Sequence, residues 1–105
     1  MPDPAAYRRI ARYCRDRLNE ARPRADVAAQ LRCWAVECDR AAQLHDLEDQ
    51  ARRHRMRAEE YRSVLEQMVS PIARATFQHL AKSDEAIARR LEAAGNQIRR
   101  KRRIG

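Results

Sequence analysis

The fold is decided in the middle of the chain, where residues 44–60 read LHDLEDQARRHRMRAEE. Most of these residues are good helix formers, and residues 24–69 contain no glycine, proline or asparagine. A single helix over this whole stretch would have about 46 residues and a length of ~69 Å. No segment of the chain alternates apolar and polar residues with a period of two, so strands are not expected.

The apolar stripe of this central stretch changes phase along its length. The first line of apolar positions is Leu31, Trp34, Cys38 and Ala41 or Ala42; the second is Leu47, Ala51, His54, Ala58, Tyr61, Leu65 and Met68. At ~100° per residue, the two lines fall on roughly opposite sides of a straight helix. Either the helix continues and offers these faces to two neighbours, or it breaks near residues 44–55 and the chain forms a four-helix bundle. The sequence favours the continuous helix.

Proline marks the two flanking helices. Asp3-Pro4 is a helix cap followed by proline in the first turn, and Ser70-Pro71 repeats this signature. Pro23 ends the first helix, whose apolar positions are Tyr7, Ile10 or Ala11, Cys14, Leu18 and Ala21. The stripe predicted for the last helix is Ala73, Phe77, Leu80, Asp84, Ile87, Leu91, Ala94 and Ile98. Gly95-Asn96 is expected to end or fray that helix.

The chain also contains a weak internal repeat. The segment that begins at Ala11 can be laid on the segment that begins at Ala58, which places Arg15 on Arg62. After a slip of one residue the alignment continues with Leu31 on Phe77, Trp34 on Leu80, Ala35 on Ala81 and Asp39 on Glu85. The shared order of helix, proline turn and helix predicts two tandem hairpins. We therefore expect one helical domain over residues 1–97, with hairpins at 4–43 and 51–97, and a basic tail at 98–105.

The second hairpin carries a family resemblance. Residues 58–92, AEEYRSVLEQMVSPIARATFQHLAKSDEAIARRLE, contain A-x-x-Y, P-x-A-R and F-x-x-L-A elements. In this pattern the segment resembles small uncharacterised helical-hairpin proteins of alphaproteobacteria, although Asp84 stands where the pattern more often has an apolar residue. The resemblance covers about a third of the chain. It implies a helical hairpin and, because no activity is established for the family, it implies no site.

Composition narrows the class of protein. Charged residues make up 36 % of the chain and the net charge is +8. The N-terminus has no apolar run of the kind found in signal peptides, and no window approaches the ~18 apolar residues of a membrane span. The three cysteines are an odd number without a disulfide framework, so a reducing cytoplasm is expected.

Sites for catalysis or metal binding are not expected. Each histidine lacks the glutamate three positions earlier that di-iron bundles use, and the cysteine spacing does not suit zinc. Cys14 and Cys38 lie on predicted seams as small apolar groups. Cys33 falls off the stripe, and we expect it to be the exposed thiol and the remote candidate for a reactive one. His54 is predicted to be a core histidine. Asp84, a carboxylate within a seam, needs a partner, which we expect to be Tyr61 or Arg62.

Both ends of the chain are basic. Residues 70–105 carry nine cations and three anions. Phosphate groups of nucleic acid would attract the cations near the C-terminus, which are Arg89, Arg90, Arg99, Arg100, Lys101, Arg102 and Arg103. The cluster contains no aromatic residue for base stacking, and no sequence-reading motif is visible. Binding to nucleic acid without sequence preference is therefore the alternative function.

The sequence as a whole predicts an all-α, cytoplasmic, non-enzymatic module for protein interaction or assembly, without a cofactor and without a membrane segment. Alanine-rich hairpins of this size bury little surface alone. A homodimer, alone or with an unidentified protein partner, would bury more. The residues expected to anchor the core or the interface are Tyr7, Trp34, Tyr61, Phe77, Leu80 and Ile87.

Overall fold

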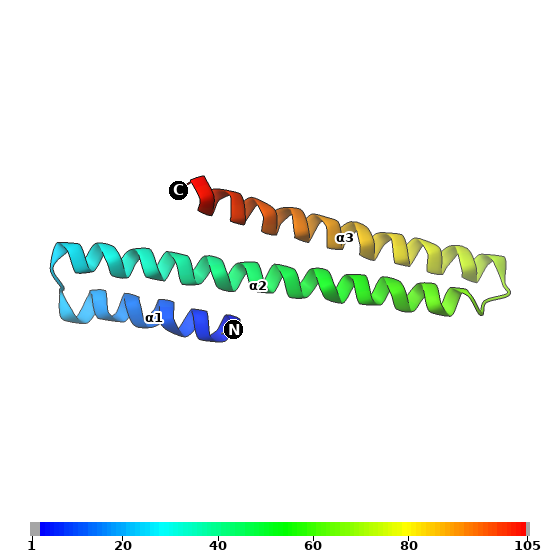
Figure 1. Ribbon diagram of the computed structural model, residues 1–105. Helices are drawn as coiled ribbons and strands as arrows, with labels where there is room; N and C mark the ends of the chain where they lie inside the picture. Colours follow the sequence, from blue (N-terminus) through cyan, green and yellow to red (C-terminus); the bar gives the residue numbers. More distant parts are fainter. Residues whose placement is uncertain (1–2, 105) are drawn as a thin grey trace. The chain divides into compact units, whose positions relative to one another are not determined.

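The computed structural model describes the backbone of residues 3–104 and the side chains of these residues except those of residues 21 and 102–104. This part of the chain forms three α-helices and no strand (Figure 1). Their bounds are Pro4–Ala21 for α1, Ala25–Leu65 for α2 and Pro71–Ile104 for α3. The predicted all-α fold with one long central helix is confirmed. The alternative break near residues 44–55 does not occur, because α2 is a single helix of 41 residues.

Side chains predicted to cap the helices begin both α1 and α3. The Asp3 carboxylate accepts a hydrogen bond from the Ala6 amide at 2.8 Å, and the Ser70 hydroxyl accepts one from the Ala73 amide at 3.4 Å. Each satisfies an amide that has no partner within its helix. Proline follows each cap, at a position where a helix needs no amide hydrogen.

The connection from α1 to α2 is short and takes a left-handed residue. Arg22 has φ 41° and ψ 60°, a conformation that glycine usually supplies at the end of a helix. Pro23 follows and prevents α1 from continuing. The turn from α2 to α3 is held by Arg74, which donates from one guanidinium nitrogen to the Leu65 carbonyl at 3.1 Å and to the Met68 carbonyl at 3.0 Å. A cation at the C-terminus of α2 also complements the helix dipole.

The chain divides into two compact units, residues 1–46 and 47–105, whose described parts we call hairpin 1 and hairpin 2. In hairpin 1, α1 runs antiparallel to the first part of α2; in hairpin 2, α3 runs antiparallel to the remainder of α2 (Figure 1). The first part of α2 therefore belongs to hairpin 1, and the remainder of α2 belongs to hairpin 2. Within the described residues, no helix combines the length and the apolar character needed to cross a bilayer.

The core of each hairpin is a seam of alanines. Hairpin 1 buries Ala11, Cys14, Ala35 and Ala42, and hairpin 2 buries Ala51, Ala58, Ala81, Ala88 and Gly95. Within each helix of hairpin 2 these residues recur every seven positions, which is close to two helical turns. No large side chain among the described residues is fully buried. We call the buried small residues of the two hairpins, including Cys14 and Gly95, the alanine seam.

The stripe predicted for α3 is correct for one row of residues and wrong for the other. Phe77, Asp84, Leu91 and Ile98 do face inward, with Asp84 buried and the others half-buried. Their expected companions Leu80 and Ile87, however, are 36 % and 37 % exposed, and Ala94 is also exposed. The seam uses the next residue along instead, which is Ala81, Ala88 or Gly95. The facing surface of α2 presents alanines, and small residues on both helices let the backbones approach closely.

A similar one-residue difference occurs in α2. The sequence places Trp34 on the inward line, but Trp34 is 47 % exposed while its neighbour Ala35 is 3 % exposed. Gly95 was expected to end or fray the last helix, and the structure instead buries Gly95 and continues α3 to Ile104. The absence of a side chain at Gly95 suits the crowded seam, which offsets the low helix propensity of glycine. Residues 98–104, expected as a tail, are part of α3.

Candidate interaction surface

One side of each hairpin is lined by ion pairs that link its two helices, and we call this side the ionic flank. In hairpin 1 the pairs are Arg8–Asp46 and Arg15–Asp39; in hairpin 2 they are Glu48–Arg99, Arg55–Glu92 and Arg62–Glu85. Paired residues recur every seven positions along each helix, so they lie on the same side of the alanine seam. Because these pairs are exposed, each contributes little to stability, but together they fix the register of the helices.

The ionic flank repeats between the two hairpins. The sequence alignment places Arg15 on Arg62 and Asp39 on Glu85, and the structure joins each arginine to the corresponding acid. Arg8 and Arg55, each seven residues earlier, also pair with equivalent acids. Sequence reasoning did not identify these pairs. The seven-residue spacing of the arginines, matched by the spacing of acids on the next helix, was the signal that could have found them.

The pair between Arg55 and Glu92 has the best-defined geometry on this flank. Two guanidinium nitrogens of Arg55 donate to the two carboxylate oxygens at 2.6 and 2.9 Å. The hydrogen bond from Arg55 lowers the pKa of the Glu92 carboxyl, and the bond to Glu92 raises the pKa of Arg55. In hairpin 1, the hydrogen bond to Asp39 likewise raises the pKa of Arg15. The charged forms of these groups are thus the stable ones.

The opposite side of hairpin 1 is apolar and exposed, and we call it the open flank. Its floor is half-buried and includes Tyr7, which stacks on His45 with a ring-centroid distance of 5.7 Å. Beyond that floor, large apolar side chains reach solvent: Ile10 at 45 %, Val27 at 37 % and Trp34 at 47 % exposure. Tyr13, one turn from Ile10, is 61 % exposed. Helical periodicity places Ile10, Val27 and Trp34 on the side of the seam away from the ion pairs.

Hairpin 2 has an equivalent open flank. Tyr61 and Phe77 form its floor and meet edge to face, with ring centroids 5.7 Å apart. The exposed residues beyond them are Val64, Leu80 and Ile87. Leu80 is the residue that the internal alignment matches with Trp34. Of the six predicted anchors, Tyr7, Tyr61 and Phe77 are therefore half-buried within a hairpin, whereas Trp34, Leu80 and Ile87 lie on the open flanks.

Asp84 is the buried polar residue of the hairpin 2 floor. It is 6 % exposed, and its carboxylate lies 2.7 Å from Nδ1 of His54 and 3.8 Å from Arg57. The predicted partners, Tyr61 and Arg62, are wrong: Tyr61 packs on Phe77 and Arg62 pairs with Glu85. Antiparallel register explains the difference, because the floor residues of α2 meet those of α3 and His54 is the floor residue nearest Asp84. His54 is a half-buried histidine within the hairpin, as predicted.

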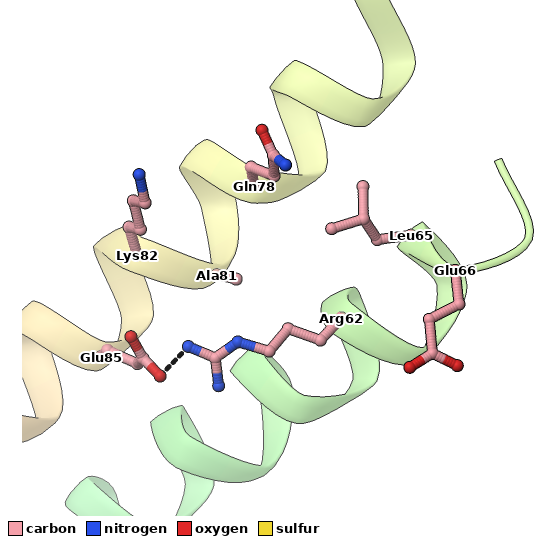
Figure 2. Close-up of a pocket in the computed structure, with 7 residues that line it drawn as sticks. All are labelled: Arg62, Leu65, Glu66, Gln78, Ala81, Lys82 and Glu85. Carbon is pink, nitrogen blue, oxygen red and sulfur yellow. Dashed lines mark hydrogen bonds and ion pairs between the residues drawn. The ribbon is translucent and has the colours of Figure 1, made fainter. Parts of the chain in front are cut away.

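An open groove of about 460 Å³ lies near the turn of hairpin 2 (Figure 2). Its lining combines charged side chains with Leu65 and Ala81. Figure 2 shows Arg62 reaching across from α2 to Glu85 on α3, with Leu65 toward the turn. A second, smaller groove contains the Glu48–Arg99 pair. Both grooves belong to the ionic flank, and each contains one of its ion pairs between helices.

The basic residues predicted to bind nucleic acid fall into three groups. Arg89, Arg90, Arg100 and Lys101 are exposed on α3. Arg99 differs from them, because it pairs with Glu48 and also donates to Asn96 at 3.2 Å. The side chains of Arg102 and Arg103 lie outside the described residues. Arg89 and Arg100 are eleven residues apart, as are Arg90 and Lys101, and eleven residues are nearly three full turns. Four exposed cations therefore form two short rows along one side of α3.

The cysteines are free thiols in three environments. Cys14 is buried, Cys38 is half-buried and Cys33 is exposed. Across the described residues, no three histidine, cysteine or acidic side chains come together as a metal site. Comparison of the chain with family models, with curated proteins and with solved structures finds no match. The resemblance noted for residues 58–92 therefore stays a prediction.

Proposed function

We propose that the chain is a non-enzymatic helical module for assembly, and that a second copy of the chain covers its open flanks to form a homodimer. The observation that carries this proposal is that each hairpin buries small side chains and exposes large apolar ones. Alanines fill the seam, where each buried methyl contributes only about 0.8 kcal/mol. Trp34, Ile10 and Leu80 meanwhile each keep more than a third of their surface exposed.

The exposed area favours association. Trp34 and Tyr13 each leave about half of their surface uncovered, and an aromatic side chain buries 150–250 Å² when fully covered. Together with the aliphatic residues beside them, they give an apolar patch of roughly 300 Å², which lies within the ~300–600 Å² of the largest patch on a typical monomer, a patch that is often functional. The open flank of hairpin 2 adds a smaller aliphatic patch of Val64, Leu80 and Ile87, and the polar border would supply the rest of the ~800 Å² per partner that a stable interface buries.

The border of the open flanks suits a second copy of the same chain. Exposed cations, Arg17 and Arg57, and exposed acids, Glu37 and Glu60, lie on helix positions next to the apolar residues. A self-complementary surface needs both signs of charge, because each patch meets its own copy. Free thiols in all three cysteines support placing this assembly in the reducing cytoplasm.

Sedimentation equilibrium tests the proposal. The wild-type protein should reach close to twice its mass of 12.3 kDa at micromolar concentration. Trp34→Glu should weaken association by about 30-fold or more, as expected for a central tryptophan. The control Val36→Glu changes a residue of similar exposure, 45 % against 47 %, two positions along the same helix and outside the open flank. It should alter the dissociation constant less than about threefold. A folded wild-type monomer at every concentration, or equal effects of the two variants, would contradict the proposal.

The rows of cations on α3 favour a second candidate function, binding to nucleic acid without sequence preference. Because α3 continues to Ile104, Arg89, Arg90, Arg100 and Lys101 are held at helical spacing instead of on a flexible tail. Cations in this arrangement can lie along a phosphate backbone and release its counterions. No base-reading group accompanies them, so affinity would depend on salt and hardly on sequence.

Fluorescence anisotropy with labelled duplex and single-stranded DNA tests this second function. Replacing both Arg100 and Lys101 with glutamine should reduce the slope of log affinity against log salt by about 2, since each phosphate contact contributes ~0.9. Replacing Arg52 and Arg53 with glutamine removes the same charge from exposed positions on α2 and should change the slope by less than half as much. Absence of binding at ~50 mM salt, or equal slopes for the two variants, would exclude the function.

A further inference from the structure

Two of the three thiols, one from each helix, lie in the same apolar cluster of hairpin 1. Cys14 on α1 is 2 % exposed and belongs to the same apolar cluster as Cys38 on α2, together with Ala11, Ala35 and Leu31. The cluster contains residues of both helices, with Cys14 entering it from α1 and Cys38 from α2. Cys33 is exposed and does not belong to this cluster.

The register of the hairpin supports this pairing. Tyr7 stacks on His45 between the same two helices. One heptad further along α1 from Tyr7 is Cys14, and one heptad back along α2 from His45 is Cys38. Because the helices are antiparallel, these steps run in the same spatial direction, and the thiols occupy the next equivalent place. The alanines around them let the helix backbones approach closely, which a disulfide needs because it spans no more than ~7 Å between Cα atoms.

We propose that Cys14 and Cys38 form a redox-active dithiol, which a hydroperoxide oxidises to a disulfide within hairpin 1. The Cys38 thiolate attacks the terminal peroxide oxygen, the O–O bond breaks, and the leaving alkoxide or hydroxide takes up a proton. Cys38 is then a sulfenic acid. The Cys14 sulfur attacks the Cys38 sulfur, the S–O bond breaks, and the hydroxyl leaves as water with the proton of Cys14. Two electrons pass from the two sulfurs to the peroxide.

Exposure decides which cysteine reacts first. Cys38 is half-buried, so a small peroxide can reach its sulfur, whereas Cys14 is enclosed and acts as the resolving thiol. Burial raises the pKa of the Cys38 thiol, with further contributions from Cys14 on α1 and from Asp39 and Glu37 on α2. At neutral pH the reactive thiolate is therefore scarce, and oxidation should accelerate as the pH rises toward this raised pKa.

The disulfide would join α1 to α2 and stabilise hairpin 1. It closes the loop between residues 14 and 38, which contains the α1–α2 connection, and so restricts the unfolded chain. We expect the melting temperature of the oxidised protein to rise by roughly 10 °C.

The test uses the full chain carrying Cys33→Ser, which removes the exposed thiol that would otherwise link two molecules. The protein is treated with hydrogen peroxide at a dilution where sedimentation shows monomers, so that the result does not depend on association. Intact mass should fall by two hydrogen atoms. Tryptic mapping should recover Tyr13–Arg15 joined to residues 33–40, and a reductant should reverse both changes. The reaction should be several-fold faster at pH 9 than at pH 7.

Two matched variants, each lacking one cysteine of the pair, serve as controls for disulfide formation. Cys14→Ala in the Cys33→Ser background keeps a small residue in the alanine seam and should give no joined peptide and no rise in melting temperature. Cys38→Ala in the same background should behave likewise. A wild-type-like protein whose Cys14 and Cys38 both stay reduced would overturn the proposal. So would cysteines that oxidise only to sulfinic acid or only between molecules.

Discussion

Replacing Ala88 with leucine is expected to destabilise hairpin 2 by about 3 kcal/mol, the upper end of the usual cost of overpacking a core. Ala88 is completely buried in the seam between α2 and α3. A leucine there must either push the helices apart or adopt a strained rotamer. Urea unfolding followed by far-ultraviolet circular dichroism measures the change in the free energy of unfolding.

Ala93→Leu is the matched control. It introduces the same side chain into the same helix at an exposed position. Leucine and alanine have similar helix propensities, so the free energy of unfolding should change by less than about 0.5 kcal/mol. If Ala88→Leu proves as stable as Ala93→Leu, the seam is not closely packed and this description of the core is wrong.

The second large effect is expected at the buried carboxylate of hairpin 2. In His54→Ala, Asp84 loses its hydrogen-bond partner at 2.7 Å while staying buried, which should destabilise the protein by about 2 kcal/mol. Arg57, at 3.8 Å, is too distant to replace that hydrogen bond in its present position. Thermal and urea unfolding of the variant measure the loss.

A double variant separates the loss of a partner from the loss of packing. His54→Leu combined with Asp84→Leu removes both polar groups and fills the floor with apolar side chains, and it should be at least as stable as the wild type. Arg57→Ala, the control on the same helix, should cost less than about 1 kcal/mol because the arginine is mostly exposed. A double variant as unstable as His54→Ala would show that the carboxylate is not what makes the single variant unstable.

Local signals were enough to predict the helices. Asp3-Pro4 and Ser70-Pro71 act through atoms within one helical turn, so their hydrogen bonds follow from the sequence. The continuity of α2 follows from the lack of any helix-breaking residue between residues 24 and 69. These features depend only on neighbouring residues, which explains why the three helices and their order could be predicted.

The seam could not be predicted in the same way. On α3, the inward-facing positions Phe77, Asp84 and Leu91 have leucine and isoleucine on one side and alanine and glycine on the other. Either side could complete an apolar stripe with them. The alternating four- and three-residue spacing of the stripe predicts Leu80 and Ile87 as its members. The structure chose Ala81 and Ala88, since the facing part of α2 supplies Ala51 and Ala58. Which side of α3 packs against α2 therefore depends on both helices, and it cannot be predicted from the periodicity of α3 alone.

The partner of Asp84 was missed for a related reason. The choice between His54 and Tyr61 depends on the register of α2 against α3 along their axes, because the two residues are seven positions, or about two turns, apart. Arg62 lies on the ionic flank, where it pairs with Glu85. The ion pairs between Arg55 and Glu92 and between Arg62 and Glu85 specify that register. Had the equal spacing of arginines and acids been read first, His54 would have followed as the neighbour of Asp84.

The most direct test of the alanine seam is a set of methyl–methyl nuclear Overhauser effects in the labelled full chain. The structure predicts that the Ala88 methyl group shows cross-peaks to alanine methyls of α2, with Ala51 and Ala58 as the expected partners. The Ile87 methyls should show none to those alanines within the same molecule. Cross-peaks from Ile87 to Ala51 or Ala58, with Ala88 exposed to solvent, would mean that the bulky stripe forms the core, and would contradict both the seam and the open flanks.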